Sequence, residues 1–465
     1  MKKVLFTVFA GVLAGMMIAP ARAADDADEM FTFNGEVRAR YEYLNNYIDL
    51  TDNDSGSAVG ADAMGIIPYR VIVGITGNFE KNVSAHVDLQ YAGHMGDEFH
   101  PSKDNPLFLP IGSPMGQADV AYLDITQGMQ LYQGWLEIGK IGGSDFGARV
   151  GRAEHTYGTE LFMGDNDYYN GLSFDGFRGM WQHGSSDLNF FYYKIAEENC
   201  LGANCFTPNG SGPGASADSN LWGVTYDWKF KRWGTVGGYA LISQDLGFDG
   251  PVGIPDSKVM TYGLRWNRGM MTDDNLNMFD WNLEYAMQTG DLGEPFAITP
   301  AIDISSYVLE GWFAFNFNVG DSHGRVHIGT LMTGGQDPAS VDAESFIPLY
   351  GDFHAYNRFG DLDWVDQFGP HNITDFNIGY EHWFGDAHYV MFAYHMFSDT
   401  ESAVGQPEDH IGDEFDLKYG YKYSKNLGFE VLLGQASPDD AYFAFFGLPT
   451  TDPVERLAFM AKLDW

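Results

Sequence analysis

The feature that most constrains this sequence is a two-residue alternation of apolar and polar side chains that recurs along the chain. It is clearest in residues 31–45, 278–288, 307–318 and 414–424. Successive side chains of a β-strand point to opposite faces, whereas a helix would scatter these residues around its circumference. In 278–288, one face would carry Phe279, Trp281, Leu283, Tyr285 and Met287, and the other Asp280, Asn282, Glu284 and Gln288. The pattern predicts many strands with one apolar and one polar face.

The first residues predict export from the cytoplasm. Two lysines at positions 2 and 3 precede an apolar run over 4–20, and Ala21-Arg22-Ala23 has the small-x-small pattern that signal peptidase cleaves. We therefore predict a signal peptide at 1–23 and a single mature domain at 24–465, because no linker or shift in composition divides the remainder. No later apolar run reaches the roughly 18 residues that a spanning helix needs.

A closed barrel in a membrane accounts best for these observations. The chain is 15% aromatic, has 57 glycines and lacks long apolar runs after its start. This composition suits a barrel wall, in which alternate residues face lipid and water. A soluble β-sandwich shows the same alternation, but the chain length and the export signal favour the barrel. The final segment ends on an aromatic residue, as outer-membrane barrels commonly do, and alternates Leu457, Phe459, Ala461, Leu463 and Trp465.

The connections between the alternating segments show a second regularity. Short turns at 81–82, 142–144, 185–187, 320–322, 385–386 and 425–426 alternate with long polar segments at 49–65, 97–119, 199–220, 336–372 and 401–412. Short periplasmic turns and long extracellular loops are typical of outer-membrane barrels. The count predicts an all-β fold, a transmembrane antiparallel up-and-down β-barrel of about 18 strands in a Gram-negative outer membrane. Closure would pair every backbone polar group within the lipid.

The two cysteines of the chain, Cys200 and Cys205, lie close together in one of the predicted extracellular loops. Export would place them in an oxidising compartment, where a local disulfide can persist. A metal site would need further ligands nearby, and the neighbouring sequence offers none. We therefore predict a disulfide that constrains the loop.

The segment 146–178, FGARVGRAEHTYGTELFMGDNDYYNGLSFDGFR, resembles the signature of alginate-export family outer-membrane channels. The residues that carry this resemblance are Val150, Gly151, Arg152, Tyr157, Gly158, Phe174, Asp175, Gly176 and Arg178. A second segment, 345–434, contains SFIPLYGDFHAYNRFGDLD and HIGDEFDLKYGYKYSKNLGFEVLLG and is also similar to the family. The resemblance implies an 18-stranded barrel, in agreement with the count of segments, and a channel that exports alginate, a polyanion.

The balance of charge argues against a polyanion as the natural solute. The chain has 26 Lys+Arg against 64 Asp+Glu, and signal cleavage would remove three cations and no acids, taking the net charge from −38 to −41. A polyanion needs positive groups along its route, such as rings of Arg or Lys. The predicted pore-lining residues instead carry both signs: Arg38, Arg40, Glu42, Arg149, Asp175, Arg178, Glu284, Glu310, Glu381, Lys418, Lys422 and Arg456.

From this mixture we predict a porin-like channel for passive diffusion of ions and small neutral or cationic solutes. The alternative is an exporter of an exopolysaccharide such as alginate. An enzyme is not predicted, because the sequence has neither a Gly-x-Ser-x-Gly elbow nor a His-Glu-x-x-His motif. The expected partners are outer-membrane lipid and lipopolysaccharide, the barrel-assembly machinery, periplasmic chaperones and small solutes, but no nucleic acid. A monomer and a trimer are both compatible with the sequence.

The long segment 336–372 is predicted to fold into the barrel and narrow the pore, because it has more aromatic residues than a solvated loop needs. The residues expected at this constriction are Phe353, Tyr356, Arg358, Asp361, Asp363 and Trp364. Acidic pairs at 52–54, 165–167 and 361–363 offer oxygen ligands to Ca²⁺. None continues as a full calcium-loop motif, so solvated acidic loops are the simpler interpretation and no cofactor is expected.

Overall fold

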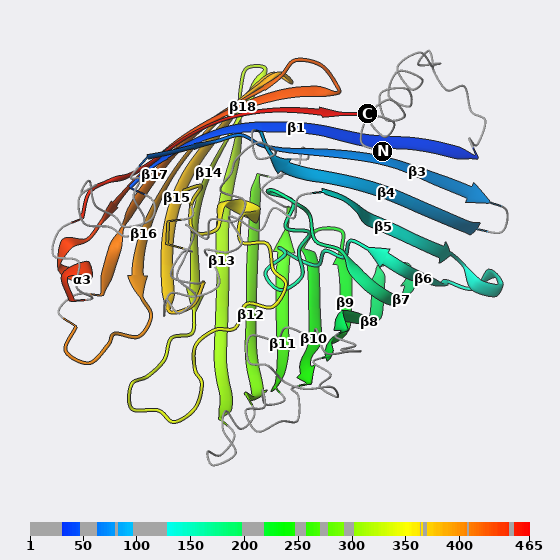
Figure 1. The fold of residues 1–465 in the computed structure, drawn as a ribbon, viewed down its shortest axis with the longest axis horizontal. Coiled ribbons are helices and arrows are strands. Elements are labelled where there is room, and N and C mark those ends of the chain that lie inside the picture. Colours follow the sequence, from blue (N-terminus) through cyan, green and yellow to red (C-terminus); the bar gives the residue numbers. More distant parts are fainter. Residues whose placement is uncertain are drawn as a thin grey trace, which may run out of the picture.

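The strands of the computed structural model pair antiparallel in chain order until the sheet closes on itself (Figure 1). The structure describes residues 30–46, 63–79, 82–95, 128–197, 218–246, 257–269, 278–292, 302–362, 364–365, 370–406, 409–445 and 451–465. The predicted signal peptide and the predicted Cys200–Cys205 disulfide lie outside these residues.

Nineteen strand elements form the described part of the wall. They are β1 (Phe31–Asn45), β2 (Ala63–Ile66), β3 (Pro68–Phe79), β4 (Val83–His94), β5 (Gly128–Ile138), β6 (Phe146–Ala153), β7 (Phe174–His183), β8 (Ser186–Glu197), β9 (Asp218–Phe230), β10 (Gly234–Leu246), β11 (Ser257–Arg268), β12 (Phe279–Asp291), β13 (Asp303–Val319), β14 (Ser322–Thr333), β15 (Ile373–Phe384), β16 (His388–Asp399), β17 (His410–Lys422), β18 (Leu427–Pro438) and β19 (Val454–Asp464). β2 and β3 are parts of one barrel strand, because both pair with β1 in one continuous register. The wall therefore has 18 strands, which confirms the predicted fold and strand number.

Helical structure is sparse in the described residues. It comprises the 3-10 turns η4 (Ile141–Gly143) and η5 (Ala355–Asn357) and the short helix α3 (Asp440–Phe445). None of the described helices is long and apolar enough to cross a membrane.

Closure of the barrel depends on the pairing of β1 with β19, which places Val37 opposite Leu463. At the end of this seam the backbone N–H of Gly35 donates to the carbonyl of Trp465, and the N–H of Trp465 donates to the carbonyl of Gly35, each at 3.1 Å. Position 35 requires glycine, because a Cβ there would overlap the indole ring of Trp465. β19 also pairs with β18, so the described wall strands form a ring without a free edge.

The two faces of the wall differ in chemistry. Outward-facing side chains are apolar and exposed, for example Phe33, Val37, Leu283, Ile328, Ile378 and Phe415. Inward-facing side chains are polar and buried, for example Glu36, Arg38, Arg70, Asp280, Glu310, Arg325 and Asp416. A continuous band of exposed apolar side chains is what hydrocarbon requires. The alternation in the sequence is therefore an alternation between lipid and lumen.

The two ends of the barrel differ in their connections. At the end where β1 begins and β19 stops, adjacent strands are joined by short turns, for example at 184–185 and 320–321. Gly184, Gly320 and Gly385 lie in such turns with φ values of 60°, 63° and 61°, a conformation that glycine adopts without strain. The connections at the opposite end are long. This asymmetry is the one expected for short periplasmic turns and long extracellular loops.

Two matched substitutions on the lipid-facing surface test the assignment of the two faces. Ile328 is 48% exposed in the middle of β14, whereas Val319 is 57% exposed at the last residue of β13. We expect Ile328→Arg to destabilise the barrel by about 2–4 kcal/mol and Val319→Arg by about 0–1 kcal/mol, because the cost of arginine falls from the bilayer midplane to the interface. Urea unfolding in lipid vesicles measures both values, and equal costs at the two positions would contradict the assignment.

Candidate functional site

Two of the long connections fold back into the barrel and contact its inner wall. The first inward loop comprises residues 154–173, between β6 and β7, and the second comprises 334–372, between β14 and β15. Both are visible inside the ring of strands in Figure 1, coloured teal and yellow. The guanidinium of Arg38 donates to Asp167 of the first loop at 2.7 Å, and Lys418 donates to Asp361 of the second loop at 2.9 Å. Charged side chains of the wall therefore hold both loops in the lumen.

The two inward loops also bind each other. The N–H of Gly164 donates to the carbonyl of Tyr350 at 2.8 Å, and the N–H of Tyr350 donates to the carbonyl of Phe162 at 3.1 Å. A further bond of 2.9 Å joins the N–H of Asp352 to the carbonyl of Glu160. Because these bonds connect main chain to main chain, the loops form one assembly inside the barrel.

An apolar cluster joins this assembly to the inner wall. Its members are buried residues of both loops and of the inner wall, among them Leu161, Phe162, Met163, Phe174, Phe191, Tyr193, Leu221, Leu241, Phe346, Phe359, Leu362, Trp364, Val365 and Phe397. Burial of one such large side chain contributes about 1.5–3 kcal/mol. The cluster therefore favours the inward position of both loops, in addition to the ion pairs.

The sequence did not lead us to predict that the first loop folds inward. The available signal was the apolar run of Leu161, Phe162 and Met163 within an otherwise polar connection. The Tyr157-Gly158 pair, which contributes to the resemblance to the alginate-export family, anchors this loop. The hydroxyl of Tyr157 donates to Asp227 at 3.0 Å, and Gly158 adopts a φ of 68°, which places the chain against the wall.

Arg358 is the principal polar anchor of the second inward loop. It is buried, and its Nε donates to Glu310 of β13 at 2.5 Å. Its guanidinium also donates to the carbonyl of Asp352 in its own loop at 2.8 Å, and to the carbonyl of Thr159 in the first loop. A single guanidinium thus joins the wall and both loops.

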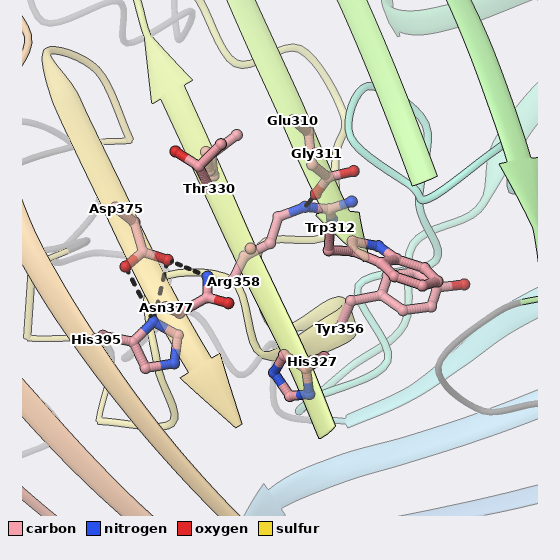
Figure 2. A pocket seen from close by; sticks show the side chains of 12 residues that line it. Glu310, Gly311, Trp312, His327, Thr330, Tyr356, Arg358, Asp375, Asn377 and His395 are labelled. Carbon is pink, nitrogen blue, oxygen red and sulfur yellow. Dashed lines mark hydrogen bonds and ion pairs between the residues drawn. The ribbon is translucent and has the colours of Figure 1, made fainter. Parts of the chain in front are cut away.

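A small cavity adjoins this anchor (Figure 2). Its volume is about 30 Å³, and it lies between β13, β14, β15, β16 and the second inward loop. Figure 2 shows Arg358 reaching Glu310 on one side and His395 against Asp375 on the other, with Nδ1 3.0 Å from the nearer carboxylate oxygen. A space of this size holds a water molecule rather than a solute. This cavity is therefore too small to be the path of a solute.

Most of the predicted pore-lining residues lie on the inner face of the wall. These are Arg38, Arg40, Glu42, Arg149, Arg178, Glu284, Glu310, Glu381, Lys418 and Arg456. Lys422 is exposed at the last residue of β17, next to a short turn. That these side chains line the solute path remains a prediction.

The prediction for Asp175 was wrong, because this residue faces outward. It pairs across the wall with Arg152 and shares its face with Phe177, which is exposed to lipid. The inner face at this point carries Phe174, which is buried in the apolar cluster and packs against Tyr350. An apolar residue inside and a charged residue outside invert the usual order, so alternation alone gives the wrong face.

The predicted constriction residues have different positions within the second inward loop. Arg358 and Asp361 contact the wall, while Phe353 and Tyr356 are half-buried. Trp364 is fully buried in the apolar cluster, so it packs within the loop's apolar contacts and does not face the lumen space. Asp363 lies outside the described residues.

Three carboxylates meet where the inward loops touch. Glu160, Asp165 and Asp352 have oxygen atoms within 4.8 Å of one another. Burial, together with the charges of Asp165 and Asp352, raises the pKa of Glu160 to about 7. The pKa of Asp165 is also raised by burial and by nearby carboxylates. The pKa of Asp352 is instead lowered, because its interactions with His354 outweigh its burial.

The acidic stretch 165–167 does not act as one set of ligands. Asp165 belongs to the carboxylate cluster, whereas Asp167 binds Arg38 and lies 3.0 Å from the guanidinium of Arg70. The two carboxylates therefore have different partners. The absence of a cofactor at this stretch stays an expectation, with loop-bound Ca²⁺ as its alternative.

Comparison with known proteins decides the family. A family model for alginate export matches residues 30–444, most of the chain. The chain belongs to the alginate-export family. Family and fold together place this alginate-export family barrel in the outer membrane, as predicted, and indicate a transport channel rather than an enzyme. No curated protein matches the sequence.

Solved structures of porins share the fold at low sequence identity. OpdL of Pseudomonas aeruginosa has a TM-score of 0.53 at 10% identity over 94% of this chain and 98% of that one. OccK11 (OpdR) of the same organism has a TM-score of 0.51 at 12% identity over 93% and 96%. A BenF-like porin from Pseudomonas fluorescens Pf-5 has a TM-score of 0.51 at 11% identity over 94% and 99%. These likenesses show the barrel fold alone.

Removing the cation of the second inward loop should widen the channel. Arg358→Met leaves Glu310 buried without its partner, and breaking such a pair costs about 3–5 kcal/mol. We expect the loop to leave the lumen while the wall stays folded, which would raise the single-channel conductance. The control is Arg152→Met, because Arg152 pairs with Asp175 on the outer face of the wall at 2.8 Å and its loss should leave the conductance unchanged. A folded Arg358→Met barrel with wild-type conductance would show that the loop does not narrow the path.

Proposed function

We propose that this alginate-export family barrel is a channel for passive diffusion of ions and small neutral or cationic solutes. The supporting observation is that the inward-facing cations are paired. Of the cations that are predicted to line the pore and lie on the inner face, all but one form an ion pair with a carboxylate of the described residues. The ion pairs are Arg38–Asp167, Arg40–Glu42, Arg149–Glu137, Lys418–Asp361 and Arg456–Glu42. Arg178 instead donates to the amide oxygen of Asn189 at 3.0 Å.

Paired cations offer little attraction to a passing polyanion. A conduit for such a chain needs positive groups whose field reaches the solute, as in rings of Arg or Lys. Here Arg70 is bound to Glu36 at 2.8 Å, and Arg265 to Asp227 at 2.8 Å. The buried residues of the lumen also include more carboxylates than cations, such as Asp88 and Glu414, which would favour cations over anions.

Export of an exopolysaccharide such as alginate is the alternative, and family membership favours it. Its best structural support is a cluster of guanidinium groups from β1, β3 and β19, where Arg38, Arg40, Arg70 and Arg456 lie close to Tyr168. Each of these arginines has an ion pair of 3.4 Å or less. An incoming uronate would have to displace an existing carboxylate, so we favour small solutes.

Lipopolysaccharide contact, assistance by the barrel-assembly machinery and chaperones, and assembly as a monomer or trimer remain predictions. None of them is needed for the proposed passive transport.

Reversal potentials in a planar bilayer with a salt gradient test the proposed selectivity. We expect potassium to be preferred over chloride in the wild type. Glu42→Gln should shift the preference towards chloride, because it removes the carboxylate that binds both Arg40 and Arg456. Asp464→Asn, which removes an exposed charge at the end of the last strand, should leave the selectivity as it is. Preference of the wild type for chloride, together with current block by alginate oligosaccharides, would instead support the exporter.

A further inference from the structure

Two glutamates face each other on the wall beneath the inward loops. Glu284 of β12 lies directly opposite Glu310 of β13 in the strand register. The two residues are 2% and 5% exposed, so water does not screen their charges. Like charges directly across a sheet are destabilising. When two carboxylates share a dry site, one of them retains a proton.

The hydroxyl of Thr159, in the first inward loop, joins this pair. Its Oγ1 lies 2.7 Å from Oε2 of Glu310 and 3.2 Å from Oε2 of Glu284. A hydroxyl has one hydrogen and can donate to only one of these oxygens. If both glutamates were ionised, the second carboxylate oxygen would face a lone pair of the hydroxyl. A proton on Oε2 of Glu284 resolves this conflict, since Glu284 then donates to Thr159 and Thr159 donates to Glu310.

The remaining contacts of the pair agree with a proton at that position. Oε1 of Glu284 accepts from the hydroxyl of Tyr239 at 2.7 Å, and Oε1 of Glu310 accepts from Arg358 at 2.5 Å. Asn282 donates to Oε2 of Glu310 at 3.0 Å. Glu310 thus receives the bonds that suit an ionised carboxylate, whereas in the described residues Glu284 accepts from one neutral donor, the hydroxyl of Tyr239.

If both glutamates were ionised, the surrounding cations would neutralise only one of the two negative charges. Arg358 is the cation bonded to the pair, while Arg265 of β11, which also lies near Glu284, is bound to Asp227. The other titratable groups that face the pair are Tyr157 of the first loop, Asp352 and Tyr356 of the second, Tyr239 of β10, His327 of β14, Asp375 of β15 and His395 of β16. Asp352 accepts from the main chain of His354, and Asp375 is held by His395. One guanidinium therefore serves two glutamates.

We infer that Glu284 carries a proton while both inward loops are docked, and that loss of this proton releases the loops and opens the channel. Docking excludes water from Glu284, so the docked state binds the proton more tightly than an open state in which lumen water reaches the carboxylate. Docking is therefore favoured at lower pH and is lost as the pH rises. The inference rests on the proposed passive channel, because ion flow is its main readout.

Single-channel conductance of the full-length barrel, recorded from about pH 5 to about pH 9, tests this device. We expect the wild-type conductance to rise with pH and to follow the titration curve of a single group. Glu284→Gln imitates the protonated carboxyl group, so it should keep the low conductance throughout. The control is Glu455→Gln, because Glu455 is an exposed glutamate of β19 on the same outward face as Leu457 and Phe459; it should keep the wild-type curve.

Two results would overturn the inference. One is a wild-type conductance that falls, or stays constant, as the pH rises. The other is a transition that persists in Glu284→Gln but disappears in Glu160→Gln, which would assign it to the carboxylate cluster between the loops. Infrared difference spectra supply an independent readout, because the band of a protonated carboxyl group should be present in the wild type and weaker in Glu284→Gln. The intensity of that band does not depend on which solute crosses the channel. The infrared test therefore remains valid even when the selectivity experiment contradicts the proposed function.

Discussion

The structure depends on the absence of water from the hydrocarbon of the membrane. Backbone N–H and C=O groups that cross this layer must pair with each other, and a ring of strands does so without leaving an edge. Closing the ring encloses the inner face of the wall, so that its charged side chains become buried. Burial of an isolated charge is costly, and opposite charges and hydrogen bonds must offset that cost. The ion pairs of the lumen thus follow from the same constraint as the fold.

Within this frame, the two inward loops contribute charges that the wall lacks. Arg358 supplies the cation for Glu310, and Asp167 and Asp361 supply carboxylates for Arg38 and Lys418. Polar wall residues and loops therefore stabilise each other. Because the same side chains determine both the width and the charge of the path, a change that moves a loop also exposes a charge that the loop had neutralised. We therefore expect the width of the path and its ion selectivity to be coupled in this barrel.

The sequence alone was sufficient for the barrel, its strand number and the inner face of most wall positions, because lipid and water impose opposite requirements on alternate residues. It was insufficient where an inward loop, and not water, covers the inner face of the wall. Phe174 faces inward because the first loop covers it, and Asp175 consequently faces outward, against the prediction. The second loop was predicted to fold inward from its aromatic residues, whereas only Leu161-Phe162-Met163 indicated the first. Contacts such as Thr159 with Glu284 join residues far apart in the chain, and periodicity contains no information on them.

The seam between β1 and β19 has a consequence for biogenesis. The contact of Gly35 with Trp465 joins residues that are 430 positions apart in the sequence, and bringing such distant residues together is slow. β19, which pairs with β1 at the seam, is synthesised after all the other strands of the wall. A nascent or truncated polypeptide would therefore leave the edge of β1 unpaired, and an unpaired strand edge promotes aggregation. Chain termination before Val454 would remove the seam altogether.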